Sequence, residues 1–168
     1  MKAGVHMKRS LILIGLVLLI SGLWFFNFIR DEGEFTKWSH ASVGKGVLIE
    51  SKAVYIGYHF RWDGIGKPTI EKVELLKRDG SEDAKVELYM SNKEIGTYDE
   101  EDAIKEGIIQ TLFPVKGFTP DTNFFIVLRV GQGDIQSDQD IRKISITYTK
   151  FGQSHVQTLS FEDGVISD

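Results

Sequence analysis

Residues 53–62 read AVYIGYHFRW, and this stretch decides the fold of the chain. Large apolar side chains recur at every second position, which is the spacing of a β-strand with one buried face. These side chains are Val54, Ile56, Tyr58, Phe60 and Trp62. The pattern predicts a strand with Trp62 in the core and with His59 and Arg61 on the polar face.

Four further segments on the C-terminal side predict strands. Alternation or a run of β-branched and aromatic residues marks 86–90, 123–130 (NFFIVLRV), 144–149 and 155–161. The segment 70–77 (IEKVELLK) fits a strand and also a helical stripe. Its shortness and the preceding Pro68 favour the strand.

Turn signals and one short helix complete the fold prediction. Arg78-Asp79-Gly80 predicts a hairpin-like turn leading from 70–77 toward Val86. Between Tyr98 and Gly107, early acidic residues, a late lysine and a final glycine predict about two helical turns. No strands alternate with long helices. We therefore expect a mainly β protein, an antiparallel β-sandwich with one short helix. An immunoglobulin-like arrangement is one form of it, although no cysteine pair surrounds a tryptophan.

The N-terminal part predicts a membrane span. Leu11–Ile29 contains no charge and fifteen large apolar side chains among nineteen residues. At about 1.5 Å per residue this segment is about 28 Å long as a helix, close to the thickness of a bilayer core. Aromatic residues crowd its C-terminal end, where they suit the boundary between lipid and water.

The flanking charges predict the direction of this span. Lys2, Lys8 and Arg9 precede it, whereas Arg30 is followed by acidic residues, so the N-terminus is expected in the cytoplasm. A cleavable signal peptide is the alternative. The length of the apolar run, and bulky rings where small residues would be needed, favour an uncleaved anchor.

These features divide the chain into four parts. Residues 1–10 are expected as a cytoplasmic N-terminus and residues 11–29 as the transmembrane helix. Residues 30–46 mix charge, glycine and serine and are expected as a tether. Residues 47–168 are expected to form one extracytoplasmic domain, which must hold together without disulfides because the chain has no cysteine.

The charge balance argues against a nucleic-acid partner. Of the 20 lysines and arginines, four precede residue 31, whereas all 24 acidic residues follow residue 30. Residues 31–168 therefore carry a net charge of −8 and lack the basic face that phosphate backbones require.

No catalytic, cofactor or metal residue can be assigned from motifs. Gly64–Thr69 is not a phosphate-binding loop, because Arg61 stands where the first glycine is needed and Pro68 stands where the hydroxyl residue is needed. Asp134, Asp138 and Asp140 could ligate Ca²⁺, but their spacing is not that of an EF-hand, and a solvated loop is favoured. No G-x-S-x-G elbow is present, and the four histidines lie far apart in sequence. A zinc site or a triad assembled by folding stays open.

Trp38 is the best candidate for an exposed aromatic ring. It stands in the expected tether, and flat rings of this kind bind sugars or peptides in many sandwich domains.

Three segments and the C-terminus carry a family resemblance: KPTIEKVELLKRDG, FPVKGFTPDTNFFIVLRV, KISITYTKFG and FEDGVISD. On these, most of residues 53–168 resembles a group of uncharacterised small membrane-anchored extracytoplasmic proteins of Bacillus-type Gram-positive bacteria. The resemblance implies one membrane and an outward-facing domain, and it carries over no site residue.

Together these expectations describe a non-enzymatic interaction or structural module of the cell envelope. It would sit in the plasma membrane by a single N-terminal span, without a cofactor, and meet another envelope protein or a wall component. The alternative is a ligand-binding domain for Ca²⁺, a wall saccharide or a peptide. An extracytoplasmic enzyme is the least favoured class.

Overall fold

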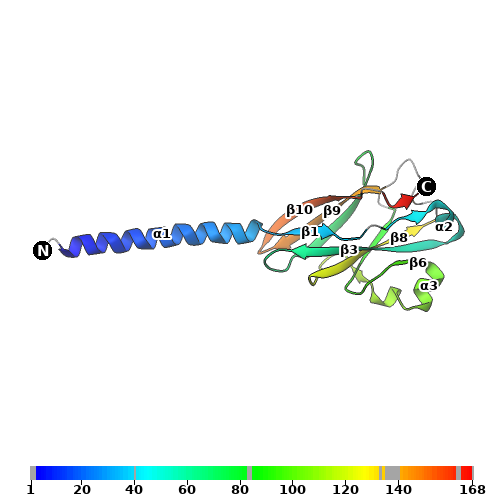
Figure 1. Cartoon of the computed structure of the whole chain (residues 1–168), viewed down its shortest axis with the longest axis horizontal. Helices are drawn as coiled ribbons and strands as arrows, with labels where there is room; N and C mark the ends of the chain where they lie inside the picture. The colour runs from blue at the N-terminus through cyan, green and yellow to red at the C-terminus, as the bar shows by residue number, and fades with distance from the viewer. Residues whose placement is uncertain are drawn as a thin grey trace. The chain divides into compact units, whose positions relative to one another are not determined.

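The structure is a computed structural model that describes residues 3–39, 41–82, 85–132, 134, 141–161 and 164–167. The chain divides into two compact units, residues 1–33 and residues 34–168. Figure 1 labels many of their helices and strands. The two units are described separately below.

The first unit is the helix α1, Ala3–Asp31. Among the described residues, Ile12–Asp31 is long and apolar enough to cross a membrane, with a mean hydropathy of 2.4 and none of it buried. The Trp24 and Phe28 rings stack one turn apart, with centroids 6.1 Å apart. The apolar helix expected from the sequence is therefore present, and it has the length and composition of an anchor or a signal sequence.

The second unit is built on a larger sheet of six strands. Its main path runs β1 (Glu34–Lys37), β3 (Ala53–Asp63), β8 (Asn123–Gly131), β5 (Glu87–Ser91) and β7 (Phe113–Pro114), all antiparallel. The sixth strand, β6 (Thr97–Asp99), pairs with β3 at Val54–Ile56, beyond the reach of β1. The 53–62 stretch is thus the strand that most of this sheet is built around.

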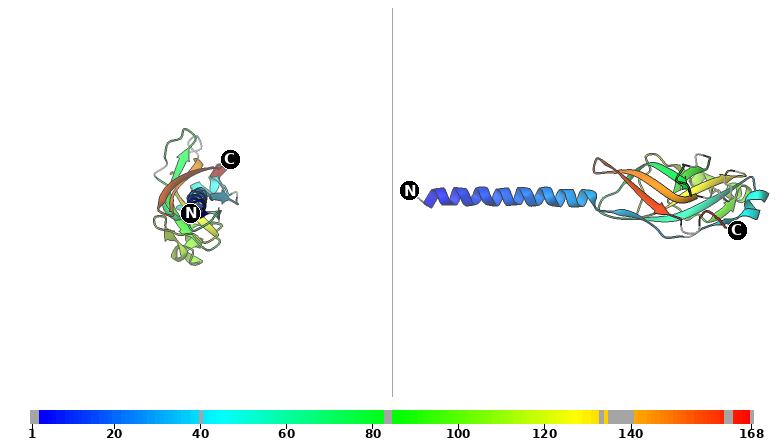
Figure 2. Two further views of the ribbon diagram at one scale, coloured as in Figure 1. Left: turned by 90° about the vertical axis from the view of Figure 1, so that its left-hand side faces the viewer. Right: turned by 90° about the horizontal axis from the view of Figure 1, so that it is seen from above.

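A smaller sheet packs against the larger one, and Figure 2 shows the two layers from two sides. It consists of β10 (Gln153–Ser160), β9 (Ile141–Lys150) and β4 (Thr69–Lys77), again antiparallel. A short parallel pair, β2 (Val43–Gly44) with β11 (Ile166–Ser167), forms a separate two-stranded sheet whose Val43 packs into the main core. The helical pieces are α2 (Lys45–Glu50), α3 (Glu100–Lys105) and the 3₁₀ turn η1 (Ile109–Thr111).

The core lies between the two sheets and follows the period-two pattern of the strands. Alternate side chains of β3 and β8 face β4 and β9, and aromatic rings fill one end of this space. Trp62 is 7 % exposed and contacts Phe35 and Tyr148 there. The predicted β-sandwich with a buried Trp62 is confirmed.

A second apolar cluster covers part of the outer face of the larger sheet. Tyr55 and Val127 point away from the main core and pack against Ile95 and Ala103, which belong to the segment between β5 and β7. Gly57 permits this close approach, because a Cβ there would clash with the carbonyl oxygen of Ile95. α3 and its flanking loops therefore cover part of the outer face of the larger sheet.

Two expectations differ from the structure. Residues 30–46, expected as a tether, include β1 and β2, and the domain begins at Glu34. Residues 34–38 contain too few apolar side chains to predict a strand from the sequence. Phe35 is buried there by contacts with residues that are distant in the chain. The turn at Arg78–Gly80 forms and is closed by an antiparallel bridge between Leu76 and Glu82. β4 and β5 nevertheless belong to different sheets, so they do not pair with each other across this turn.

The short helix is confirmed and begins as its sequence predicts. The Asp99 carboxylate accepts a hydrogen bond from the Asp102 backbone N–H at 2.8 Å, which caps the first turn of α3. Acidic residues fill that turn and Lys105 ends the helix, as the helix dipole favours.

Candidate functional site

The outer face of the larger sheet carries a group of aromatic and cationic side chains near the start of the domain. Trp38 directly follows β1, His59 and Arg61 lie on the polar face of β3, and Phe125 lies beside His59 on β8. We call these four residues the outer aromatic patch. Strand pairing brings together positions that are far apart in sequence.

Ring contacts run through the patch from one strand to the next. The His59 imidazole stacks on the Phe125 ring with centroids 4.9 Å apart and planes 13° from parallel. The Trp38 ring centroid lies 6.4 Å from that of His59, and the Arg61 guanidinium carbon lies 5.5 Å from the Trp38 centroid. A cation at this distance from an indole contributes about 0.5–1 kcal/mol at an exposed site.

Backbone hydrogen bonds fix the position of Trp38. Its N–H donates to the His59 carbonyl at 2.8 Å, which extends the pairing of β1 with β3 by one residue. The Ser39 hydroxyl oxygen accepts from the His59 N–H at 2.7 Å. Trp38 is nevertheless 58 % exposed. The ring is thus held on a sheet while much of its surface stays open to solvent.

An ion pair fixes the cationic side of the patch. The Arg61 Nε lies 2.7 Å from an Asp63 carboxylate oxygen, and the Thr36 hydroxyl donates to the other oxygen of that carboxylate at 3.3 Å. Arg61 thus has an acidic partner beside the indole, and both side chains of this ion pair are 40 % exposed. The patch thus places a flat apolar ring, a guanidinium and an imidazole side by side on one face of the sheet.

A polar network on the same face holds α3 against the sheet. The Arg129 guanidinium donates to Glu87 at 2.9 Å and to Glu100 at 2.8 Å, and the hydrogen bond to Glu100 is the main reason why the Arg129 pKa is raised. The Tyr89 hydroxyl donates to Glu87 at 2.6 Å, which raises the pKa of Tyr89. Because each charge faces a partner, this network has a structural role.

Hollows elsewhere in the second unit are open and modest. One of about 310 Å³ lies beside β7 and includes Phe113, Lys116 and Phe118. Another, of about 270 Å³, lies between the end of α2 and the start of α3, where Glu50 and Glu101 are among its lining residues. Neither hollow has a histidine among its described lining residues.

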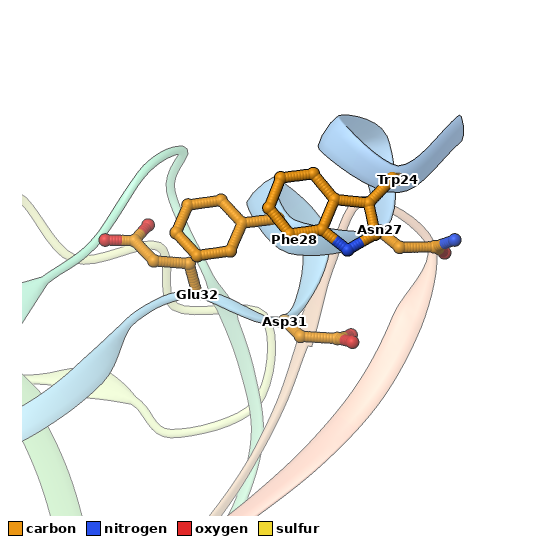
Figure 3. A pocket seen from close by; sticks show the side chains of 5 residues that line it. All are labelled: Trp24, Asn27, Phe28, Asp31 and Glu32. Atoms are coloured by element: carbon orange, nitrogen blue, oxygen red, sulfur yellow. The ribbon is translucent and has the colours of Figure 1, made fainter. Parts of the chain in front are cut away.

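The end of α1 carries a hollow of its own, of about 420 Å³ (Figure 3). Figure 3 shows the Trp24 and Phe28 rings side by side and the Asp31 and Glu32 carboxylates pointing in different directions. Asn27 completes its lining. Aromatic rings followed by charged groups are typical of a helix end at a membrane–water interface.

The candidate residues from the sequence are placed as follows. Trp38 is exposed as expected, although it ends a strand instead of standing in a tether. His155 is half-buried and stacks on Tyr148 with centroids 5.2 Å apart. It lies on β10 of the smaller sheet, whereas His59 lies on β3 of the larger sheet. Asp134 accepts from the Gly131 N–H at 2.6 Å. Asp138 and Asp140 lie outside the described residues, so the calcium interpretation stays untested.

No catalytic, cofactor or metal residues were predicted from the sequence, and that prediction stays untested. Among those residues, no three His, Cys, Asp or Glu side chains converge on a point where they could hold a metal ion. Sequence reasoning missed Phe125 as a patch residue, because NFFIVLRV reads as uniformly buried. The pairing of β3 with β8 was needed to find it, because Phe125 lies directly opposite His59 and therefore on the same outer face.

Comparison with known proteins adds no family to this description. No protein-family model, no curated protein and no solved structure matches the chain.

Proposed function

We propose that this chain is a single-pass membrane protein that acts as a non-enzymatic interaction module of the cell envelope. In this proposal α1 stays in the plasma membrane with its N-terminus in the cytoplasm. The β-sandwich is extracytoplasmic and meets another envelope protein or a wall component through the outer aromatic patch. The resemblance to anchored extracytoplasmic proteins is one ground on which we propose this location.

Two features support the membrane part of this proposal. Ile12–Asp31 has the length and hydropathy of a span. Basic residues precede the apolar run, whereas Asp31, Glu32 and Glu34 follow it, which favours a cytoplasmic N-terminus.

The single observation that carries the interaction part is the placement of Trp38. Trp38 is 58 % exposed, its backbone is held by a hydrogen bond to His59, and its ring lies beside His59 and Arg61. Covering such a ring costs less conformational freedom than covering one on a mobile loop. Tryptophan and arginine are the residue types that most often dominate binding energy at protein interfaces.

Photo-crosslinking in living cells tests this function. A photoreactive phenylalanine analogue replaces Trp38 in the full chain. The control replaces Val156, which is 67 % exposed on the outer side of the smaller sheet. We expect a specific adduct with one envelope protein or wall polymer at position 38 and none at 156. Equal labelling at both positions, or no adduct at 38 while the purified chain turns over a small substrate, contradicts the proposal.

A wall saccharide is the second candidate for what the patch binds. The geometry favours it over Ca²⁺, because sugar rings stack on flat exposed indoles and an adjacent guanidinium can donate to hydroxyl groups. Calorimetry of the full chain with wall fragments, compared with the Trp38→Ala variant, separates this candidate from a protein partner. Heat of binding that Trp38→Ala abolishes supports it, and no heat with either chain excludes it.

A further inference from the structure

Two exposed apolar side chains lie in neighbouring turns at the end of the sandwich where the chain enters it. Ile65, in the turn between β3 and β4, is 47 % exposed, and Phe151, in the turn between β9 and β10, is 50 % exposed. The Phe151 ring lies against Gly66, since a Cβ there would stand 2.7 Å from the ring. We call Ile65, Gly66 and Phe151 the apolar tip.

Strand register places the apolar tip at the end of the sandwich that begins with Glu34. Glu34 pairs with Asp63, immediately before the first tip turn. Figure 2 shows the β9–β10 hairpin, drawn in orange to red, turning at this same end of the domain. Only Glu32 and Gly33 separate Glu34 from the end of α1. The three Cα–Cα steps from Asp31 to Glu34 span at most about 11 Å, so this end is covalently tied close to the helix.

The local conformation of Phe151 argues that its side chain has a role beyond the turn. Phe151 has a φ of 50° and Gly152 a φ of 78°, as in a two-residue hairpin turn between Lys150 and Gln153. The first position of such a turn favours Asn, Asp or Gly, and a bulky residue there is rare. A half-exposed phenylalanine in a disfavoured conformation points to a function for the ring.

Several charges around the apolar tip are paired or lie beside aromatic rings. Lys67 pairs with Asp121 at 2.8 Å, and Asp63 pairs with Arg61. The Lys150 Nζ lies 5.3 Å from the Trp62 ring centroid and 5.7 Å from that of Phe151. Paired carboxylates and lysines lying along aromatic rings cost less to bring near lipid than isolated charges.

We infer that the apolar tip is a second membrane contact, in which Ile65 and Phe151 lie in the headgroup region of the bilayer that holds α1. This inference rests on the proposed function, because it needs α1 to be in a membrane. The contact would restrict rotation of the domain about its two-residue link. The outer aromatic patch would then be presented in a defined direction.

The cysteine-free chain allows a direct test by single-cysteine labelling. The full chain is reconstituted into phosphatidylcholine–phosphatidylglycerol vesicles with a polarity-sensitive fluorophore at Ile65→Cys or Phe151→Cys. Ile104→Cys, an exposed apolar position on α3, is the matched control, and Leu19→Cys reports on the helix itself. Spin-labelled lipids then quench any fluorophore in contact with the bilayer.

We expect headgroup-labelled lipid to quench positions 65 and 151 at least threefold more than position 104. Equal quenching at 65, 151 and 104, with strong quenching of Leu19→Cys by chain-labelled lipid, overturns the inference and leaves the anchor intact. No quenching at Leu19→Cys overturns the proposed anchor itself. Blue-shifted emission at 65 and 151 without lipid quenching, together with a crosslink between two copies, assigns the tip to a second copy and also overturns the inference.

A second variant separates a membrane role of Phe151 from a structural one. Phe151→Asn fits the turn better, so we expect the reconstituted chain to melt at an equal or higher temperature while quenching at position 65 falls at least twofold. A lower melting temperature with unchanged quenching would show that the ring serves packing on Gly66 instead.

Discussion

The side-chain amide of Gln157 serves as a strand partner for the backbone of Phe35. Gln157 Oε1 accepts from the Phe35 N–H, and Gln157 Nε2 donates to the Phe35 carbonyl, both at 2.7 Å. Phe35 lies on β1 of the larger sheet and Gln157 on β10 of the smaller one. The Gln157 side chain therefore connects the edges of the two sheets through the backbone of Phe35, whose ring is buried in the core.

Replacing Gln157 with Leu should destabilise the domain by about 2 kcal/mol, because two backbone groups of Phe35 lose their partners. Thr158→Val, an exposed change one residue along the same strand, should change stability by less than about 0.5 kcal/mol. Denaturant unfolding of the full chain in detergent compares the two. An unchanged midpoint for Gln157→Leu would show that water replaces the amide at no cost.

The close approach at Gly57 gives a steric prediction. Gly57→Ala places a methyl group against the Ile95 carbonyl oxygen, and we expect a loss of about 3 kcal/mol as the segment over the sheet is displaced. Gly44→Ala is the control, since its added Cβ meets nothing within 4 Å. Equal melting temperatures for the two variants would contradict the contact.

The amino-acid pattern was sufficient for the long strands but not for short strands such as β1 or for the surface that the strands create. Val54 to Trp62 alternate so regularly that the central strand and its buried face follow from period two alone. β1 is only four residues long, and its burial depends on Trp62, Tyr148 and Gln157, which are distant in sequence. The outer aromatic patch was equally hidden, because it needs the register that sets His59 opposite Phe125.

The Arg129 network predicts a local effect of mutation. Arg129→Met releases Glu100 from the sheet, and we expect amide exchange in residues 99–107 to accelerate at least tenfold. The loss in global stability should be only about 1 kcal/mol, because the network is partly exposed. Lys105→Met on the exposed side of α3 is the control. Unchanged exchange after Arg129→Met would show that apolar packing alone holds the helix.

Tyr148 predicts a loss of stability at alkaline pH. Burial raises the pKa of Tyr148 above its usual value of 10.0, so the folded state holds the phenol proton more tightly than the unfolded state does. This contribution is complete below pH 10 and is lost as the pH rises toward the raised pKa. Tyr148→Phe should flatten the fall in melting temperature between pH 10 and 11. An identical pH profile for the two chains would contradict this assignment.

The two tryptophans at the start of the domain should respond oppositely to truncation. Trp38→Ala should leave the melting temperature nearly unchanged and remove partner or saccharide binding, because the ring is exposed. Trp62→Ala should cost about 3–5 kcal/mol, because it empties a core position. Thermal melts and binding assays on the same preparations distinguish them, and retained binding by Trp38→Ala would remove the patch from the account.

The orientation of the chain in the membrane is the central claim, and cysteine labelling in intact cells measures it most directly. Single cysteines replace Ala3 near the start of α1 and Ile104 on α3, and a membrane-impermeant maleimide is added outside. The account predicts that Ile104→Cys is labelled at once, that Ala3→Cys is labelled only after permeabilisation, and that the full-length chain stays in the membrane fraction. Labelling of Ala3→Cys in intact cells, protection of Ile104→Cys, or release of a chain shortened by the length of α1 would contradict it.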